Sequence, residues 1–397
     1  MKIKEKLIAL VIATIIVSCQ EDSVEISISN ELDFDRSEEV VEVDMSVIDH
    51  WEVQDYTNLT VVDSSGQSQL FQFVDKDDDG IDETLLFIPQ VKANNKSVYK
   101  LRKRRDSEEF KTSNVQCFSR FVPERTDDYA WENDKVAFRV FGPTAQKMAE
   151  DGIKGGTLSS GVDCWLKRVE TPIIDLWYGR YLNDSQAYHH DHGEGLDDFH
   201  VGVSRGCGGI ARKVNDTYLL PKNFTQHEML TNGPLRTTFR LGYAQWGNDS
   251  MKIKHSQRVV LDKGSHFSKF DLTIEGTETI AVGLTLHEKD GEVDIDSLGR
   301  WVSYWQPHGD EDEMLGMAIL TDPKENIGAE VYDVDEKDRS NVFVTIKVSN
   351  KHLRYYSGYG WTKAGQFKNK RDWIRYLAQF SNQLAHPLGV EYLLEDI

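Results

Sequence analysis

The stretch Asn341-Val342-Phe343-Val344-Thr345-Ile346-Lys347-Val348 decides the fold class of this chain of 397 residues. Apolar β-branched side chains occupy every second position from Val342 to Val348, and the positions between them include a threonine and a lysine. A period of two places alternate side chains on opposite faces of an extended strand. The stretch therefore predicts an antiparallel strand with one buried face and one face toward solvent.

Four more runs have the same β-rich character, bounded by Gly, Asn or Asp: residues 39–45, 135–141, 251–255 and 279–287. Strong helical periodicity occurs once, near the end of the chain, where apolar residues recur at steps of three and four before Pro387: Trp373, Ile374, Leu377, Phe380 and Leu384. These patterns predict an all-β protein with one C-terminal helix.

A charged stretch, residues 102–109, marks a plausible boundary between two domains. The chain is longer than one hydrophobic core usually serves. We expect a small N-terminal β-sandwich over residues 24–105 and a large antiparallel β-sandwich over residues 110–397.

The N-terminus carries the features of a bacterial export signal. A basic start, Met1 to Lys6, precedes an apolar run and then Ser18-Cys19. This order resembles a lipoprotein signal, with residues 1–18 removed, lipid on Cys19, and residues 19–23 as a tether. The alternative is an ordinary signal peptide with a chance cysteine. The acidic residues after Cys19 resemble the surface-export signal of Bacteroidetes lipoproteins, which predicts the outer membrane, at the cell surface or on the periplasmic face.

The formal net charge of −20 disfavours nucleic acid as a partner. It also means that an anionic substrate has to be received by a local basic pocket. After Cys19 the sequence has three cysteines, Cys117, Cys164 and Cys207, without C-x-x-C spacing. Buried small apolar residues are the simplest interpretation of all three; one disulfide among them is the alternative.

Residues 75–83 have the D-x-D-x-D-G spacing of a calcium-binding loop, with Asp75, Asp77 and Asp79 as ligands. The position where an EF-hand places its bidentate glutamate is Leu86, and no flanking helices are predicted. A structural calcium ion and an acidic hairpin tip therefore remain alternatives.

The densest cluster of titratable groups is Tyr188-His189-His190-Asp191-His192-Gly193-Glu194. Buried charges and unpaired imidazoles are costly, so this segment is unsuited to ordinary core. It is consistent with a metal site using His190, His192 and Glu194, with acid–base catalysis by His and Tyr, or with a polar turn.

Three other segments offer groups that could complete a site. Arg205 lies in a glycine-rich loop and suits a carboxylate, although a structural salt bridge is equally consistent. Trp165 and Lys167 share one face of a predicted strand, and Tyr178 follows another tryptophan. Core packing is the alternative for each of these residues. The sequence contains neither a G-x-S-x-G elbow nor a phosphate-binding loop.

The segments Phe141-Gly142-Pro143, Gly161 to Trp165, Tyr188 to Gly195 and Ser204 to Gly209 together resemble a domain-of-unknown-function family. Its members occur among polysaccharide-degrading lipoproteins of Bacteroidetes, and one is described as an ulvan oligosaccharide dehydratase. The resemblance covers the chain from about residue 25 to its end. It implies a super-sandwich like that of many lyases and mutarotases. It also implies a carbon–oxygen lyase that eliminates water across C4–C5 of a terminal uronic acid in sulfated, rhamnose-containing oligosaccharides.

That reaction requires a cation at the carboxylate, a base at C5 and an acid at the 4-hydroxyl. We expect Arg205, with Lys167 as an alternative, at the carboxylate. His189 or His192 would be the base, and Tyr188 or the other histidine the acid. Asp191 and Glu194 would orient imidazoles, and the sugar would be bound by Trp165, Tyr178 and His190. No cofactor is expected to be required. The alternatives are a polysaccharide lyase and a non-catalytic surface glycan-binding lipoprotein.

Overall fold

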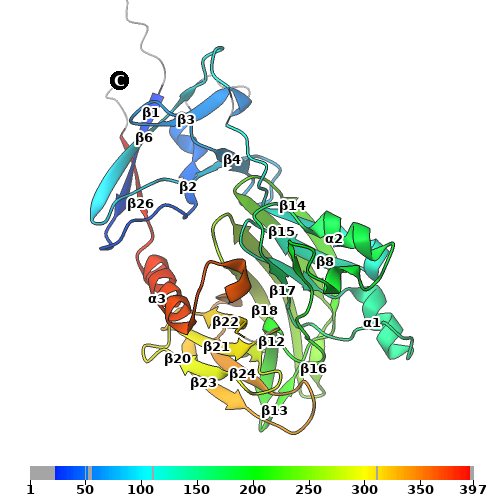
Figure 1. Cartoon of the computed structure of the whole chain (residues 1–397). Helices are drawn as coiled ribbons and strands as arrows, with labels where there is room; N and C mark the ends of the chain where they lie inside the picture. The colour runs from blue at the N-terminus through cyan, green and yellow to red at the C-terminus, as the bar shows by residue number, and fades with distance from the viewer. Residues whose placement is uncertain (1–22, 50, 52–55, 110, 310–311, 394–397) are drawn as a thin grey trace, which may run out of the picture.

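The computed structural model describes residues 23–49, 51, 56–109, 111–309 and 312–393. The described chain is built mainly from antiparallel strands in five sheets, arranged as a small domain above a large one (Figure 1). The predicted all-β class is therefore confirmed. The predicted strands are present as well. Their ends differ from the predicted ones by one or two residues, except that the run 251–255 continues as a strand to Asp262.

The small domain is a two-sheet sandwich. One sheet has the order β26-β1-β6-β3 and the other the order β2-β5-β4. Fifteen buried apolar side chains, among them Ile26, Val61, Phe87 and Leu101, form the core between them. The strands are β1 (Ser23–Asn30), β2 (Val41–Asp44), β3 (Leu59–Asp63), β4 (Phe71–Val74), β5 (Thr84–Phe87), β6 (Asn95–Lys103) and β26 (Gly389–Leu393).

The last strand of the chain belongs to the first domain. β26 pairs antiparallel with β1, with Ile26 opposite Tyr392 and Ile28 opposite Val390. Figure 1 shows this strand running from the large domain up to the small one. The large domain is thus inserted between β6 and β26, and the predicted range of 110–397 is too long at its C-terminal end.

The large domain has three sheets. The first, in order β11-β10-β9-β8-β7, consists of β7 (Phe118–Val122), β8 (Asp128–Glu132), β9 (Ala137–Val140), β10 (Asp163–Lys167) and β11 (Gly195–Leu196). The second, in order β13-β12-β19-β24-β23, consists of β12 (Cys207–Val214), β13 (Thr217–Leu219), β19 (Thr279–Thr285), β23 (Asn326–Tyr332) and β24 (Asn341–Lys347).

The third sheet has nine strands in the order β14-β15-β17-β18-β25-β22-β21-β20, with β16 paired to β17. They are β14 (Phe224–Thr231), β15 (Arg236–Tyr243), β16 (Trp246–Asn248), β17 (Met251–Asp262), β18 (Phe267–Glu275), β20 (Glu292–Ile295), β21 (Trp301–Pro307), β22 (Met314–Leu320) and β25 (His352–Trp361). Residues from all three sheets share one core, so the large domain is a super-sandwich.

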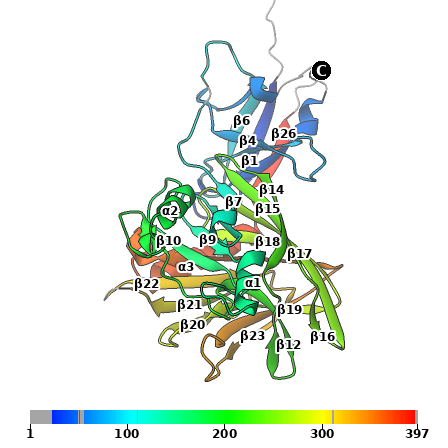
Figure 2. The ribbon, with the colours of Figure 1, turned by 90° about the vertical axis from the view of Figure 1, so that its right-hand side faces the viewer.

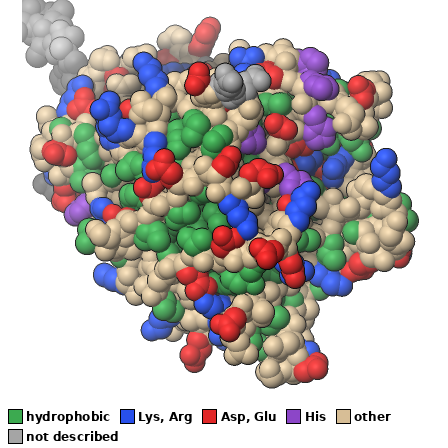
Figure 3. Space-filling model, turned by 60° about the horizontal axis from the view of Figure 1, so that its bottom comes forward, with side chains coloured by type: hydrophobic (Ala, Val, Ile, Leu, Met, Phe, Trp, Pro, Cys, Tyr) green, Lys and Arg blue, Asp and Glu red, His purple; other side chains and the backbone are tan. Residues whose placement is uncertain are grey.

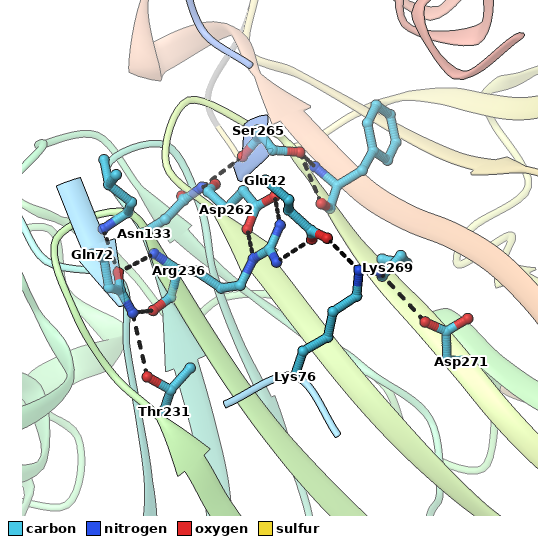
Figure 4. Close-up of polar contacts among 12 residues, drawn as sticks. Glu42, Gln72, Lys76, Asn133, Thr231, Arg236, Asp262, Ser265, Lys269 and Asp271 are labelled. Atoms are coloured by element: carbon cyan, nitrogen blue, oxygen red, sulfur yellow. Dashed lines mark hydrogen bonds and ion pairs between the residues drawn. The ribbon is translucent and has the colours of Figure 1, made fainter. Parts of the chain in front are cut away.

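Polar contacts join the two domains (Figure 4). The guanidinium of Arg236 on β15 donates to Glu42 of the small domain at 2.6 Å and to Asp262 of its own sheet. Gln72 on β4 accepts from the N–H of Arg236 and donates to its carbonyl oxygen at 3.0 Å. If the domains moved apart, these buried polar groups would lose their partners at a cost in free energy. The contacts therefore fix the position of one domain on the other.

The predicted C-terminal helix is α3 (Lys370–Ala385). Asn369 caps its N-terminus by accepting from the N–H of Asp372, and Trp373 and Leu377 are buried against the nine-stranded sheet. Two short helices were not predicted: α1 (Pro143–Glu150) and α2 (Ile174–Tyr181). In Figure 2 both lie on the near side of the large domain.

A buried histidine between this helix and the sheet should make the fold sensitive to acid. The ring of His266 donates from Nδ1 to the Tyr359 carbonyl oxygen at 3.0 Å and contacts Phe367 and Tyr376. Burial lowers the pKa of His266 to about 4. The hydrogen bond to Tyr359 and the charge of Asp134 oppose this shift, and the charge of Lys135 adds to it. The unfolded chain therefore binds the proton more readily than the folded chain between pH 6.5 and 4.

We expect this histidine to remove about 3 kcal/mol of stability as the pH falls from 6.5 to 4. Urea denaturation of the wild type and of His266→Gln across this range would measure the effect. The variant should have the flatter dependence of unfolding free energy on pH, and equal slopes would contradict the prediction.

The predicted signal peptide and the lipidation at Cys19 lie outside the described residues. Within residues 23–393, apart from the short gaps, no helix has the length and apolar character needed to cross a bilayer.

The three cysteines that follow Cys19 are all buried thiols without a disulfide, as their simplest interpretation predicted.

Candidate active-site groove

A groove on the large domain is formed by two adjoining hollows of about 600 and 660 Å³, each large enough for a sugar ring. Asp198, His200 and Asp338 line both hollows and connect them. The groove also contains His189, His287 and His308. Figure 3 shows histidine side chains gathered on one side of the underside of the molecule, among acidic and basic groups.

Arg139 on β9 forms the floor of the first hollow. Its guanidinium donates to Asp163 from Nε at 2.9 Å and to Asp197 from Nη2 at 2.9 Å. A third carboxylate, Asp128, lies 3.8 Å from Nη1. Burial opposes the charged guanidinium, but Asp197 and Asp163 raise the pKa of Arg139 above its ordinary value. Arg139 is therefore a buried cation that stabilises the negative charges of three neighbouring carboxylates.

Arg125 is the more available cation in this hollow. Its Nη1 lies 3.2 Å from Asp128, its side chain is 15% exposed, and it lines the groove. Burial raises the pKa of Asp128 to about 6, against the opposing pull of Arg139 and Arg125. Asp128 is shared between Arg125 and Arg139, and Arg125, which lines the groove, is the cation that an anionic ligand can reach.

His189 presents one ring nitrogen to the groove. It ends the 3₁₀ turn η4 (Ala187–His189), and its Nδ1 lies 2.5 Å from the carbonyl oxygen of Asp197. A carbonyl oxygen can only accept, so Nδ1 carries the proton and Nε2 keeps its lone pair. The Asp197 carboxylate lies 3.9 Å from the same Nδ1, where it stabilises an imidazolium. This arrangement suits a general base.

His200 is oriented by a carboxylate. Its Nε2 lies 2.9 Å from Oδ2 of Asp338, which fixes the Nε2–H tautomer of the neutral ring. The imidazole is 59% exposed and lies where the two hollows meet. When protonated it forms an ion pair with Asp338 and has a second N–H to donate, so it suits a general acid.

Two further histidines line the second hollow. His287 uses both ring nitrogens, toward Gln306 at Nδ1 and the His200 carbonyl oxygen at Nε2, and therefore positions the backbone of His200. His308 has a buried Nε2 with no hydrogen-bond partner among the described residues, 3.8 Å from Asp198. Burial lowers the pKa of both rings, so both are neutral at pH 7.

Of the predicted cluster, only His189 lines the groove. His190 and His192 are exposed, and Nε2 of His192 bonds the carbonyl oxygen of Ala187. Asp191 accepts from Gly193, Gly195 and Arg168, and Glu194 pairs with Arg180 at 2.9 Å. The two carboxylates thus hold the loop rather than orient imidazoles, contrary to prediction.

The predicted aromatic contacts are interior. Tyr188, Trp165 and Tyr178 are at most 2% exposed and belong to one aromatic cluster under the groove. Tyr178 donates to Asp128 at 3.1 Å, and Arg139 lies over the rings of Trp165 and Tyr188. Their position excludes direct contact with a sugar in this structure. They support Arg139 and Asp128 from below.

The two predicted cations are also buried. Lys167 is fully inaccessible and donates to Glu132 at 2.7 Å and to the Asn133 carbonyl oxygen. Arg205 is 1% exposed and donates to Ser160 and to the carbonyl oxygens of Ile210 and Val203. Neither can reach a substrate carboxylate in the groove, which corrects both predictions. The alternation of the sequence predicted that Lys167 lies with Trp165 on an accessible face of a strand. Both faces of β10 are buried, so neither side chain is accessible.

Sequence reasoning missed Arg125, Arg139, Asp197, His200 and His308. Two signals for them were present. Arg139 interrupts an otherwise apolar strand, residues 136–141, which is typical of a buried, paired charge. The titratable segment also continues beyond Glu194 to His200. Arg125 and His308 have no comparable signal, because only the folding of distant loops brings them to the groove.

The predicted calcium loop forms a compact acidic cluster. Asp75, Asp77, Asp79 and, in addition, Glu83 each offer a carboxylate oxygen within 4.8 Å of one another. Asp75 already accepts from the N–H groups of Asp78, Asp79 and Gly80. Glu83 takes the place of Leu86, which is buried in β5.

Residues 28–390 match the family model described as Domain of unknown function (DUF4861). The chain belongs to this family. A relative in Formosa agariphila, the uncharacterized protein P7, is 43% identical over 382 residues, covering 95% of this chain and 96% of its own length. The groove residues all lie within this matched range, which leaves out only the outer ends of β1 and β26.

Solved structures resemble the family member in fold alone. A protein in glycosyl hydrolase family 38 from Enterococcus faecalis superposes with a TM-score of 0.51 at 11% identity, over 94% of this chain. An alpha-mannosidase from Enterococcus faecalis V583 gives a TM-score of 0.47 at 10% identity. This chain covers 48% and 46% of those two chains, about half of their length.

Proposed function

We propose that the protein is an oligosaccharide dehydratase, a carbon–oxygen lyase. Its substrate is an ulvan-type oligosaccharide, sulfated and containing rhamnose, that ends in a uronic acid. Water leaves across C4–C5 of that terminal sugar and an unsaturated uronyl end remains. The observation that carries the proposal is the groove itself, where a cation, Arg125, lies in the same hollow as an imidazole with a free lone pair, His189.

The carboxylate of the sugar binds at Arg125 in this proposal. Its negative charge makes the C5 proton very weakly acidic, because removing that proton builds a second charge on the same carbon–oxygen system. A guanidinium beside the carboxylate stabilises the enolate-like state as it forms. Arg139 is occupied by Asp163 and Asp197 and does not compete for the substrate.

Nε2 of His189 takes the C5 proton, and the electron pair of that bond forms the C4–C5 double bond. The C4–O bond breaks, and protonated His200 gives a proton to the departing hydroxyl, so that water leaves. Asp197 and Asp338 stabilise the imidazolium forms of the two rings. The proton balance is closed by transfer from His189 to solvent and from solvent to His200. No metal or cofactor has a role in these steps.

Activity of His189→Ala and His200→Ala should fall by about 10²–10⁴-fold in kcat, as expected for lost general base or acid catalysis. His190→Ala and His192→Ala are the matched controls, because they remove exposed imidazoles from the same loop. The measurement is the absorbance of the unsaturated product at about 235 nm on uronate-terminated oligosaccharides. Full turnover by both groove variants would refute the assignment.

The alternative is a polysaccharide lyase that cleaves a glycosidic bond by the same β-elimination, since the same base and cation serve both reactions. Mass spectrometry separates them. A dehydratase yields a product about 18 Da lighter than its substrate with an unchanged number of sugars, whereas a lyase shortens the chain. Binding without any product would favour a surface glycan-binding lipoprotein.

In this proposal the protein is held at the outer membrane by lipid on Cys19.

We also propose a structural calcium ion at residues 75–83. Calcium would stabilise the loop whose Asp78 pairs with Arg240 and Arg258 of the large domain. At about a hundred times its Kd, calcium should add about 2.7 kcal/mol to stability. Thermal unfolding with calcium and with chelator, compared between wild type and Asp77→Asn, is the test. If wild type and Asp77→Asn unfold at the same temperature with calcium and with chelator, the loop does not bind the ion.

A further inference from the structure

A small cavity between the sheets of the large domain shares no lining residue with the groove. Ser160, Tyr243, His255, Gln257 and Tyr355 are among the residues that line it. Its volume of about 10 Å³ admits one water-sized occupant and no sugar. The polar side chains around such a small space make it unlike a packing defect, which would be apolar.

Arg205 adjoins this cavity and is a buried cation without a carboxylate. It donates from Nη1 to Ser160 at 2.9 Å and to the carbonyl oxygen of Ile210, both of which belong to lining residues. Its Nε–H is buried and has no partner. Within the described part of the chain no Asp or Glu pairs with it, although every other deeply buried Arg or Lys, such as Arg139 or Lys167, has one.

Two hydrogen-bond donors of the cavity lining, on His255 and Tyr243, have no acceptor among the described residues. Nδ1 of His255 accepts from the indole N–H of Trp246 at 3.0 Å, so Nε2 carries the proton, and it is buried without a partner. The hydroxyl of Tyr243 accepts from Gln257 at 2.9 Å, which leaves its own O–H to donate. Ser160 donates to Pro221 while accepting from Arg205, and the hydroxyl of Tyr355 donates to Gly208.

A water molecule would accept from these donors but would leave the guanidinium of Arg205 without a counter-charge. A monatomic anion accepts from several donors at once and compensates the buried guanidinium. Burial alone lowers the pKa of Arg205 to about 9, which shows how poorly the protein itself offsets this charge. Carboxylate and sulfate groups of a sugar are excluded by the size of the space.

We propose that this cavity binds one halide ion, chloride in ordinary buffers, with Arg205 as counter-charge and Tyr243 and His255 as further donors. The ion is a structural part of the super-sandwich. It joins Arg205, in the loop leading to β12, to β15 and β17 of the nine-stranded sheet.

Thermal unfolding in sodium gluconate, with chloride or bromide added at constant ionic strength, tests the proposal. Wild type should show a saturable rise in Tm with halide. Arg205→Met should lose that rise, and the control Arg354→Met, which removes a surface arginine, should keep it. Tyr243→Phe keeps the charge and the ring shape, and should weaken the apparent halide affinity by about tenfold.

A crystal soaked in bromide gives a reading that does not depend on stability. An anomalous peak between Arg205 and Tyr243 is the expected result. Should Arg205→Met fail to fold, the Tyr243→Phe titration and the bromide peak still decide the question. A Tm independent of halide together with an absent peak would mean that the cavity holds water only, and would overturn the proposal.

Discussion

Replacing Lys167 with Met should lower the free energy of unfolding by about 3–5 kcal/mol, because it leaves Glu132 as a buried anion without its cation. Both side chains are fully inaccessible, and Nζ lies 2.7 Å from the Glu132 carboxylate. Glu132 also accepts from the N–H groups of Ile173 and Ile174 at the start of α2. The substitution should therefore also destabilise α2, which covers this side of the sheet.

Urea denaturation of Lys167→Met, Glu132→Gln and the double variant would measure this coupling. Gln keeps the shape and a carbonyl oxygen for the α2 amides but has no charge. The double variant should therefore be more stable than Lys167→Met alone. A loss below about 1 kcal/mol in the single variant would show that the pair contributes no more than a surface salt bridge.

Arg139→Met should be at least as damaging and should also stop turnover. Asp128, Asp163 and Asp197 would lose their shared cation in a buried place, and Asp197 would no longer be held where it orients His189. Breaking such a network by removing one member costs about 3–5 kcal/mol. Arg354→Met, at a half-exposed surface ion pair, is the control and should change stability by less than about 1 kcal/mol.

The destabilisation should depend on pH with a defined sign. Burial already raises the pKa of Asp128 to about 6. Without Arg139 the folded pKa of these acids rises further above the unfolded value. A raised folded pKa means that stability is lost as the pH rises through it. Arg139→Met should therefore be closest to wild type near pH 5 and furthest from it near pH 8, as measured by denaturation at both values.

The fold class could be predicted because it rests on local patterns. Alternation in residues 341–348 and the apolar stripe of residues 373–384 are properties of single elements, and the strand and the helix they predict are both present. Phe343, on the face predicted to be solvated, is nevertheless buried. The site was harder to predict, since exposure depends on what covers a strand. Lys167 alternates like a surface residue, but the neighbouring helix and sheet enclose it.

The candidate site was located in the correct segment but with the wrong partners. His189 was singled out from a dense polar stretch, and it is the member of that stretch that reaches the groove. Arg125 comes from a loop more than sixty residues earlier, and His308 from one more than a hundred residues later. Only the register of the sheets brings them together, and a single sequence does not show that register.

The pairing of β26 with β1 has a consequence for biosynthesis. During synthesis β1 keeps one open edge until β26 has been made, so the small domain begins before the large domain and is completed after it. A product that stops even ten residues early keeps an unpaired, sticky strand and is a natural target for proteases. Synthesis of β26 closes that edge, so the first domain becomes complete only after the inserted large domain has been made.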